Sequence, residues 1–156
     1  MDNKEHLEKE LVDFLISIIP VTWEKIAFYS DNNAGSSTLF YGVREEETDI
    51  VVTSDTFRKR YADYNFDRIS ASRKLLQTVR MLYENKCIIA NDKRTFEIVC
   101  VIAADGDYRF EYIPHNSDNS DFMSREEFLM TYLNSEYFCV TSKYPSTDGI
   151  IKVPAL

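Results

Sequence analysis

Glycine, proline and histidine are scarce in this sequence of 156 residues, which contains four glycines, four prolines and two histidines. So few glycines make a phosphate-binding glycine-rich loop hard to build, and neither a P-loop nor a G-x-G-x-x-G motif occurs. The two histidines, His6 and His115, stand in no G-x-S-x-G or H-E-x-x-H motif. We therefore interpret both as surface or loop residues and not as catalytic bases or zinc ligands.

Cysteines and long apolar runs are also few. The three cysteines, Cys87, Cys100 and Cys139, have spacings that match no zinc or redox motif, and the first two stand among apolar residues that predict small core positions. The apolar stretch at 14–21 is interrupted and far shorter than the ~20 residues of a membrane-spanning helix. Because the acidic N-terminus also lacks the features of a signal peptide, we expect a cytoplasmic protein.

Apolar and aromatic residues are plentiful by contrast. They make up 44% of the chain and include ten phenylalanines and ten tyrosines, which excludes a disordered chain. A chain of this length has enough residues for one ordinary hydrophobic core. We expect a single domain over residues 1–156.

The net charge of −8 is unevenly distributed. Residues 1–57 carry four basic and twelve acidic side chains, residues 58–94 carry ten basic and four acidic ones, and residues 105–136 carry two basic and eight acidic ones. Such an acidic chain is a poor general binder of nucleic acid, because contacts to phosphate need clustered lysine and arginine. It is well suited to a basic protein partner.

Hydrophobic periodicity predicts the elements. Apolar residues spaced by three and four predict a first helix that ends at Pro20, and a second helix at 66–84 with Ile69 on its apolar side. Ser124 and Glu127 form a capping-box pattern at the start of a short third helix. Alternating or β-branched segments predict strands at 23–29, 38–43, 49–54, 95–103, 108–113 and, as an edge strand, 136–142.

Turn-forming residues separate the strands. Residues 30–37 predict a rather long hairpin loop, and Asp105-Gly106 predicts a tight turn. The tail after Tyr144 is predicted to be irregular. The order α-β-β-β-α-β-β-α, with a possible last strand, predicts an α+β fold in which helices pack on one face of an antiparallel sheet.

Trp23 is the sole tryptophan and follows the helix-stopping Pro20. A tryptophan that enters a first strand in this way is usually a core anchor. We expect it between the first helix and the sheet, near Leu11, Leu15 and the strand around Val99.

Carboxylates are the remaining candidates for catalysis. A metal-dependent hydrolase could assemble them from strand ends, and the candidates are Asp105, Asp107, Asp118, Asp121 and Glu45 to Glu47. We favour the alternative that Asp105 and Asp107 form a turn and that the glutamates lie in a solvated turn. We therefore predict a protein that is not an enzyme, with no catalytic residue, no metal site and no cofactor.

Basic and aromatic residues alternate from Phe57 to Phe66, where Arg58-Lys59-Arg60 is followed by Tyr61 and Tyr64. This composition is typical of a surface that stacks RNA bases. The chain as a whole is acidic, so we favour pairing of these cations with acidic segments of the same chain.

The segment Ile18-Ile19-Pro20-Val21-Thr22-Trp23-Glu24-Lys25-Ile26 resembles the YezG-like family, which includes the EsaG antitoxins of type VII secretion systems. In that family an Ile-Pro-x-x-Trp-x-Lys segment joins the leading helix to the first strand. Further segments resemble the family in the same order, namely 33–41, 75–80 and 105–112. The resemblance covers residues 5–113, and residues 116–156 depart from it by adding a capped helix and a tail.

The resemblance implies a cytoplasmic immunity protein that binds the toxic C-terminal domain, often a nuclease, of a secreted or contact-delivered toxin. It transfers no individual functional residue to this chain. An adaptor or regulatory module for some other basic protein is the alternative from a different class.

Two acidic loops are the predicted partner-binding site, because loops on a rigid scaffold commonly carry binding residues. The candidates are Glu45, Glu46, Glu47 and Asp49 in one loop and Asp118 and Asp121 in the other. The alternative is that these groups serve only solubility. A basic, nuclease-like toxin domain is the expected partner.

Overall fold

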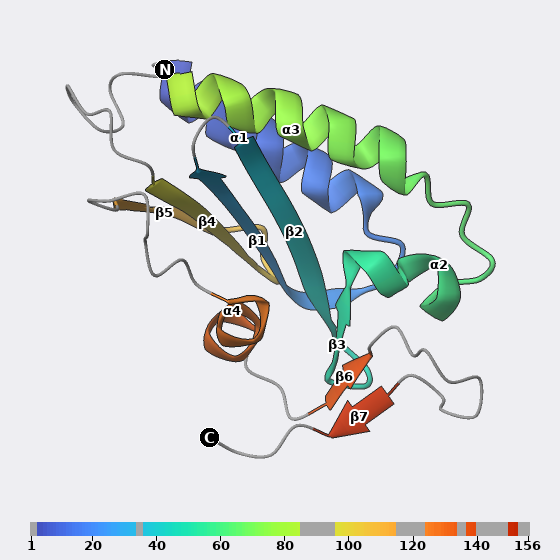
Figure 1. The fold of residues 1–156 in the computed structure, drawn as a ribbon. Helices are drawn as coiled ribbons and strands as arrows, with labels where there is room; N and C mark the ends of the chain where they lie inside the picture. The colour runs from blue at the N-terminus through green and yellow to red at the C-terminus, as the bar shows by residue number, and fades with distance from the viewer. Residues whose placement is uncertain are drawn as a thin grey trace.

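The computed structural model describes residues 3–33, 36–84, 96–114, 124–133, 137–139 and 150–152 (Figure 1). In chain order the elements are α1 (Asn3–Ile18), β1 (Trp23–Asn33), β2 (Ser36–Glu45), β3 (Ile50–Thr53), a 3₁₀ turn (Ser54–Thr56), α2 (Phe57–Arg60), α3 (Arg68–Glu84), β4 (Phe96–Ala103), β5 (Tyr108–Pro114), α4 (Arg125–Tyr132), β6 (Tyr137–Cys139) and β7 (Ile150–Lys152). The predicted α+β class is confirmed, and so is the approximate order of the elements. The short α2 and the strand β7 are additions, and β7 lies in the tail that was predicted to be irregular.

The strands form one sheet in the order β5-β4-β1-β2-β3-β6-β7. Strands β1 to β5 pair antiparallel, as predicted. The prediction is wrong for β6, which pairs parallel to β3. A parallel neighbour needs a long crossover connection, and here the chain passes through α3, β4, β5 and α4 between the two strands.

The hairpin of β1 and β2 is longer than predicted. Its ladder continues as far as the pair Asn33↔Ser36, so Ser30 to Asn33 belong to a strand and not to a loop. Ser30 is fully buried and donates a hydrogen bond to the carbonyl of Thr38 at 2.7 Å. This bond satisfies the Ser30 hydroxyl inside the sheet, so a residue type that is common in turns lies here within a strand.

One face of the sheet packs against α1 and α3 (Figure 1). Its buried residues include Leu7, Leu11 and Leu15 of α1, Leu75, Val79 and Leu82 of α3, and Ile26, Phe28, Ile98, Cys100 and Ile102 of β1 and β4. Cys100 is completely buried, as predicted, and burial raises the pKa of its thiol. Cys87 lies outside the described residues.

The opposite face packs against α4, so the prediction that the helices share one face is wrong for this helix (Figure 1). Phe128, Leu129, Tyr132 and Leu133 pack on Ala27, Tyr29, Val99 and Val101 of the sheet. The central strands are apolar on both sides, and both sides must therefore be covered. Gly42 permits the close approach, because a Cβ there would lie 3.2 Å from Leu133 Cδ1.

Helix α3 begins at a cap. The Asp67 carboxylate accepts a hydrogen bond from the Ser70 amide at 3.0 Å, as an N-terminal cap does. Ile69 was predicted on the apolar side and is 73% exposed. It lies six residues before Leu75, and at 3.6 residues per turn this spacing directs it to another side of the helix. The cap predicted for α4 is confirmed, because Ser124 Oγ accepts a hydrogen bond from the Glu127 amide at 3.1 Å.

Trp23 is partly buried and packs against the core on the face of the sheet that α1 and α3 cover. The prediction that Trp23 lies near Val99 is wrong. Val99 belongs to the opposite face of the sheet and pairs with Tyr29, further along β1. Trp23 pairs with Glu45 at the very start of β1. The tryptophan therefore lies at the end of the sheet where the first acidic loop is found.

Candidate functional site

The turn between β2 and β3, residues Glu45 to Asp49, is the predicted acidic loop that the structure describes. We call it the first acidic turn. Glu46 and Glu47 are exposed, whereas only 4% of Glu45 is exposed. The expectation of an exposed carboxylate is therefore wrong for Glu45. The other predicted residues, Asp118 and Asp121, lie outside the described residues.

Glu45 is buried because α2 and the turn itself surround its carboxylate with donors. Arg60 donates through Nη2 to Oε1 at 2.7 Å and through Nε to Oε2 at 3.1 Å, which is a bidentate pair. Tyr61 donates to Oε2 at 2.5 Å and Thr48 to Oε1 at 2.6 Å. Burial alone would raise the pKa of Glu45, but these hydrogen bonds outweigh it and hold the pKa below its ordinary value.

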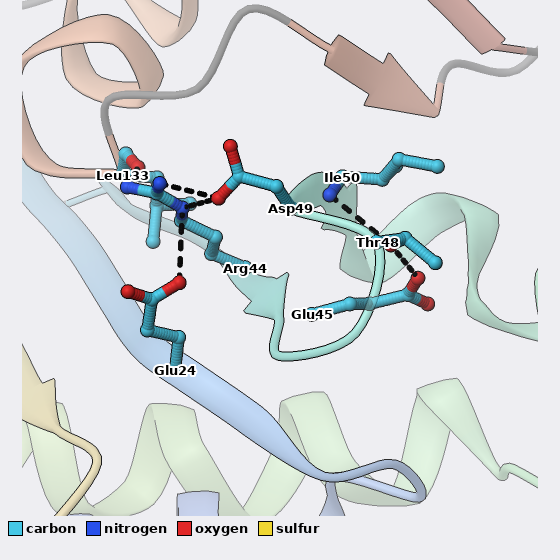
Figure 2. A network of polar contacts seen from close by, with 7 residues as sticks. All are labelled: Glu24, Arg44, Glu45, Thr48, Asp49, Ile50 and Leu133. Carbon is cyan, nitrogen blue, oxygen red and sulfur yellow. Dashed lines mark hydrogen bonds and ion pairs between the residues drawn. The ribbon is translucent and has the colours of Figure 1, made fainter.

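Asp49, at the other end of the first acidic turn, pairs with Arg44 (Figure 2). Arg44 also contacts the Glu24 carboxylate at 3.4 Å and donates to the carbonyl of Leu133, the residue that follows α4, at 3.4 Å. Asp49 has a φ of 64°, a left-handed conformation that aspartate tolerates better than most residues. Arg44 thus ties the turn to β1 and to α4.

Main-chain hydrogen bonds fix the rest of the turn. The Glu46 amide donates to the Thr22 carbonyl at 3.2 Å, and the Asp49 amide donates to the Glu45 carbonyl at 3.1 Å. The Ile50 amide donates to the Thr48 hydroxyl at 3.2 Å (Figure 2). Because the carboxylates of Glu45 and Asp49 are both paired within the chain, the backbone of the turn is held in place. Glu46 and Glu47 extend from it into solvent.

A shallow hollow lies beside Glu46. Its lining is the segment from Ile19 to Trp23, together with Glu46 and Ala104. Ala104 precedes Asp105 in the β4–β5 turn, which lies at the same end of the sheet because β4 and β2 both run antiparallel to β1. Residues 19–23 of the segment that resembles the YezG-like family therefore line a hollow between two acidic turns.

The β4–β5 turn, residues Asp105 to Asp107, is formed as predicted. Asp105 Oδ1 accepts a hydrogen bond from the Asp107 amide at 2.9 Å, and Gly106 has a φ of 92°. Both aspartates are exposed. We define the acidic rim as three exposed carboxylates at the hollow. Glu46 lines it, and Glu47 and Asp105 each directly follow a lining residue in the chain.

The basic and aromatic segment from Phe57 to Phe66 does not form a stacking surface. Phe57 is fully buried and Phe66 is 6% exposed, and their rings lie 5.3 Å apart in the core. Arg60 and Tyr61 bind Glu45, so part of this segment pairs with an acidic group of the same chain, as expected. A second such contact joins Lys74 of α3 to Glu10 of α1 at 3.1 Å.

Residues 3–33, 36–84, 96–114 and the shorter described segments hold no group of three or more His, Cys, Asp or Glu side chains arranged to bind a metal ion. Within the same residues, no helix has both the length and the apolar character to cross a membrane. His6 is exposed on α1, and His115 lies outside the described residues.

Two features of this site were not predicted from the sequence. Arg60 and Tyr61 were not identified as partners of Glu45, because they lie fifteen and sixteen residues after it along the chain. The position of Asp105 beside the first acidic turn was not predicted either. The hairpin pattern contained part of that information, but the strand order that brings β4 next to β1 was not predicted.

The comparison with curated proteins returned no match. The family model described as "Immunity protein YezG-like" matches residues 5–143. The match extends well beyond residue 113, so the prediction that residues 116–156 depart from the family is wrong as far as residue 143. Helix α4 and strand β6 lie inside the matched region, in agreement with their packing on the sheet. The chain belongs to the YezG-like family of immunity proteins.

Proposed function

We propose that this immunity protein binds the toxic domain of a secreted or contact-delivered toxin in the cytoplasm and neutralises it by binding alone. We further propose that this domain is a basic nuclease. The family match over residues 5–143 supports the immunity role, and it is the observation on which the proposal rests. The proposed contact surface is the acidic rim with the hollow beside it.

The chemistry of this surface suits a basic side chain. Ile19, Pro20 and Trp23 give the hollow an apolar lining, and Glu46 lines it as well. Lysine and arginine have long apolar stems and charged ends, so a stem can lie on the apolar floor while its charge meets a carboxylate. A partly buried tryptophan is also a common energetic centre of protein interfaces.

Charge supports the choice of a nuclease as partner. Nuclease domains bind phosphates, a task that calls for clustered lysine and arginine. An acidic inhibitor associates with such a surface quickly, because opposite electrostatic potentials raise the rate constant of association by a factor of about 10–10³. The overall net charge of −8 and the exposed acidic rim both act in this direction.

The test is to mix the purified chain with the toxin domain encoded beside its gene and to measure degradation of DNA and RNA. We expect inhibition that is complete at a stoichiometric amount of the chain, with both proteins recovered chemically intact. Without toxin the chain should degrade neither nucleic acid.

Two results would contradict the proposal. Inhibition at far below stoichiometric amounts, with cleavage or modification of the toxin, would identify an enzyme. Failure to bind the adjacent toxin domain, together with capture of another basic protein, would identify an adaptor.

A further inference from the structure

Strand β5 is an edge of the sheet, since β4 is its neighbour in the described strand order. It has seven residues, whereas β7 at the other described edge has three and ends in Lys152. Natural proteins usually protect a long edge strand with lysine, proline or a bulge, because it can otherwise pair with another chain. From Tyr108 to Ile113, β5 contains neither lysine nor proline.

The direction of the backbone groups of β5 follows from the adjoining turn. The Ala103 amide donates to the Asp107 carbonyl at 2.7 Å, and residues along an antiparallel ladder alternate between facing a partner strand and facing away. The backbone amide and carbonyl of Arg109, which lies opposite Val101, therefore point toward β4. Those of Tyr108 and Phe110 point away from β4, toward the open side of the edge strand. Pro114 falls in the outward series, where its missing N–H costs no bond to β4.

The side chains of β5 form a self-complementary sequence. Arg109 and Glu111 lie on the face of α4, where Arg109 Nη2 is 3.9 Å from Glu111 Oε1 of the same strand and 68% and 41% of the two side chains are exposed. If a second β5 runs antiparallel with a two-fold axis at Phe110, Arg109 of each copy lies directly across from Glu111 of the other. Phe110 then faces its own copy, and Tyr108 faces Tyr112.

The same register uses the outward backbone groups. Phe110 and its copy form a hydrogen-bonded pair, and Tyr108 pairs with Tyr112 in the same way. Arg109 and Glu111 then fall in a non-hydrogen-bonded pair, in which cross-strand side chains lie closest. On the other face of the paired strands, the aromatic rings of the two copies form one row. This row extends the stack that Phe110 and Tyr112 form within each copy, where their ring centroids lie 6.1 Å apart.

Helix α1 holds this edge in place. Tyr112 donates a hydrogen bond to Glu8 at 2.6 Å, and Lys4 lies over the tyrosine ring at 5.6 Å. On the other face Tyr132 of α4 donates to Glu111 at 3.1 Å. The edge strand is thus anchored on both sides, so pairing requires little further ordering.

We propose that two copies of this chain associate through β5 in an antiparallel pair around a two-fold axis at Phe110. This association joins two sheets into one and is isologous, with the same patch contributed by each copy. Glu46 and Glu47 of the acidic rim lie in the turn between β2 and β3, and β4 and β1 separate this part of the sheet from β5.

Sedimentation equilibrium over a wide range of concentration tests the proposal. The parent chain should be dimeric at high concentration. Arg109→Glu and Glu111→Arg should each weaken the dimer by roughly ten-fold or more, because each change turns two opposite-charge pairs into two like-charge pairs. The double variant R109E/E111R restores opposite charges across the axis and should restore the dimer.

Two controls separate this register from general damage. Tyr132→Phe removes the hydrogen bond to Glu111 while keeping the charge, so it should remain dimeric. Amide exchange gives a second measurement: the Phe110 amide should be protected in the dimer and exchange rapidly in R109E, whereas the Arg109 and Glu111 amides, bonded to β4, stay protected in both.

A parent chain that is monomeric at every concentration would overturn the proposal. Single charge variants that stay fully dimeric would place the contact elsewhere and also overturn it. A folded double variant that stays monomeric would refute the two-fold register.

Discussion

Two acidic turns lie at the same end of the sheet, and they use their carboxylates differently. In the first acidic turn, Glu45 is buried by Arg60 and Tyr61, and Asp49 is paired with Arg44. In the β4–β5 turn, both aspartates are exposed, and Asp105 binds only its own turn among the described contacts. Similar acidic runs in the sequence thus contain both structural and surface carboxylates.

The difference comes from what packs beside each turn. Beside the first acidic turn, Arg60 of α2 and the adjoining Tyr61 donate to Glu45, and Arg44 of β2 pairs with Asp49 and donates to the Leu133 carbonyl at the end of α4. The β4–β5 turn is a tight hairpin tip that depends on the left-handed Gly106. A carboxylate in the first turn is therefore fixed by tertiary structure, whereas one in the second is fixed by local backbone geometry.

Replacement of Glu45 should have the largest effect on stability. Glu45→Ala leaves Arg60 without its bidentate partner, and breaking a buried ion pair costs about 3 kcal/mol or more. Glu46→Ala, one residue away and exposed, is the matched control and should change the free energy of unfolding by less than about 0.5 kcal/mol. Urea unfolding of both variants measures the difference, and equal stabilities would show that the pair contributes nothing.

The pH dependence of stability sharpens the same contrast. The folded state holds the pKa of Glu45 below its ordinary value of 4.5. The contribution of the ionised Glu45 to the free energy of unfolding is therefore complete above that pH and is lost as the pH falls through the folded-state pKa. The stability difference between the parent and Glu45→Gln should therefore be constant at neutral pH and shrink in acid. Unfolding measured from about pH 6 to about pH 3 checks this. A difference that grows on acidification would reverse the sign of the proposed shift.

Gly106→Ala tests the local origin of the second turn. With a φ of 92°, the alanine would occupy a left-handed conformation, and we expect a loss of about 1–2 kcal/mol. Nothing lies within 4 Å of the added Cβ, so steric contact contributes no further loss. Thermal unfolding measures the change. An unchanged melting temperature would mean that the turn adopts another conformation.

Asp49→Asn should have the smallest effect. Asparagine keeps the tolerance for the left-handed conformation and loses only the charge of a half-exposed pair, which is worth about 0–1 kcal/mol. The loss should become smaller still in high salt, because salt screens exposed charges. A loss as large as that of Glu45→Ala, measured by urea unfolding, would make Arg44 and not Arg60 the main anchor of the turn.

Local signals in the sequence were sufficient for most elements. The three- and four-residue spacing of Leu75 and Val79, the cap at Ser124 and the Asp105-Gly106 turn each depend on neighbouring residues, and the structure contains the predicted element in each case. Non-local features were not predicted. The burial of Glu45 depends on Arg60, fifteen residues away, and the place of α4 depends on apolar residues on both faces of β1.

The proposed site shows the same division. The acidity of residues 45–49 was evident, but only the fold separates Glu46 and Glu47 from the buried Glu45. The segment from Ile19 to Trp23 was noted for its resemblance to the family. Its place in a hollow beside Ala104 requires the pairing of β1 with both β2 and β4.

The rate of association with the toxin domain tests the central claim most directly. Glu46→Lys/Glu47→Lys reverses two carboxylates of the acidic rim. The control Asp63→Lys/Glu84→Lys makes the same change in net charge at exposed residues outside that rim. We expect the first variant to associate ten-fold or more slowly than the parent, within the range of about 10–10³ for electrostatic steering.

The control should remain within a few-fold of the parent rate. The difference between the two variants should shrink as the Debye length falls from ~10 Å at 0.1 M salt to ~3 Å at 1 M. If both variants associate at the same rate at every salt concentration, the acidic rim is not the surface that guides the toxin.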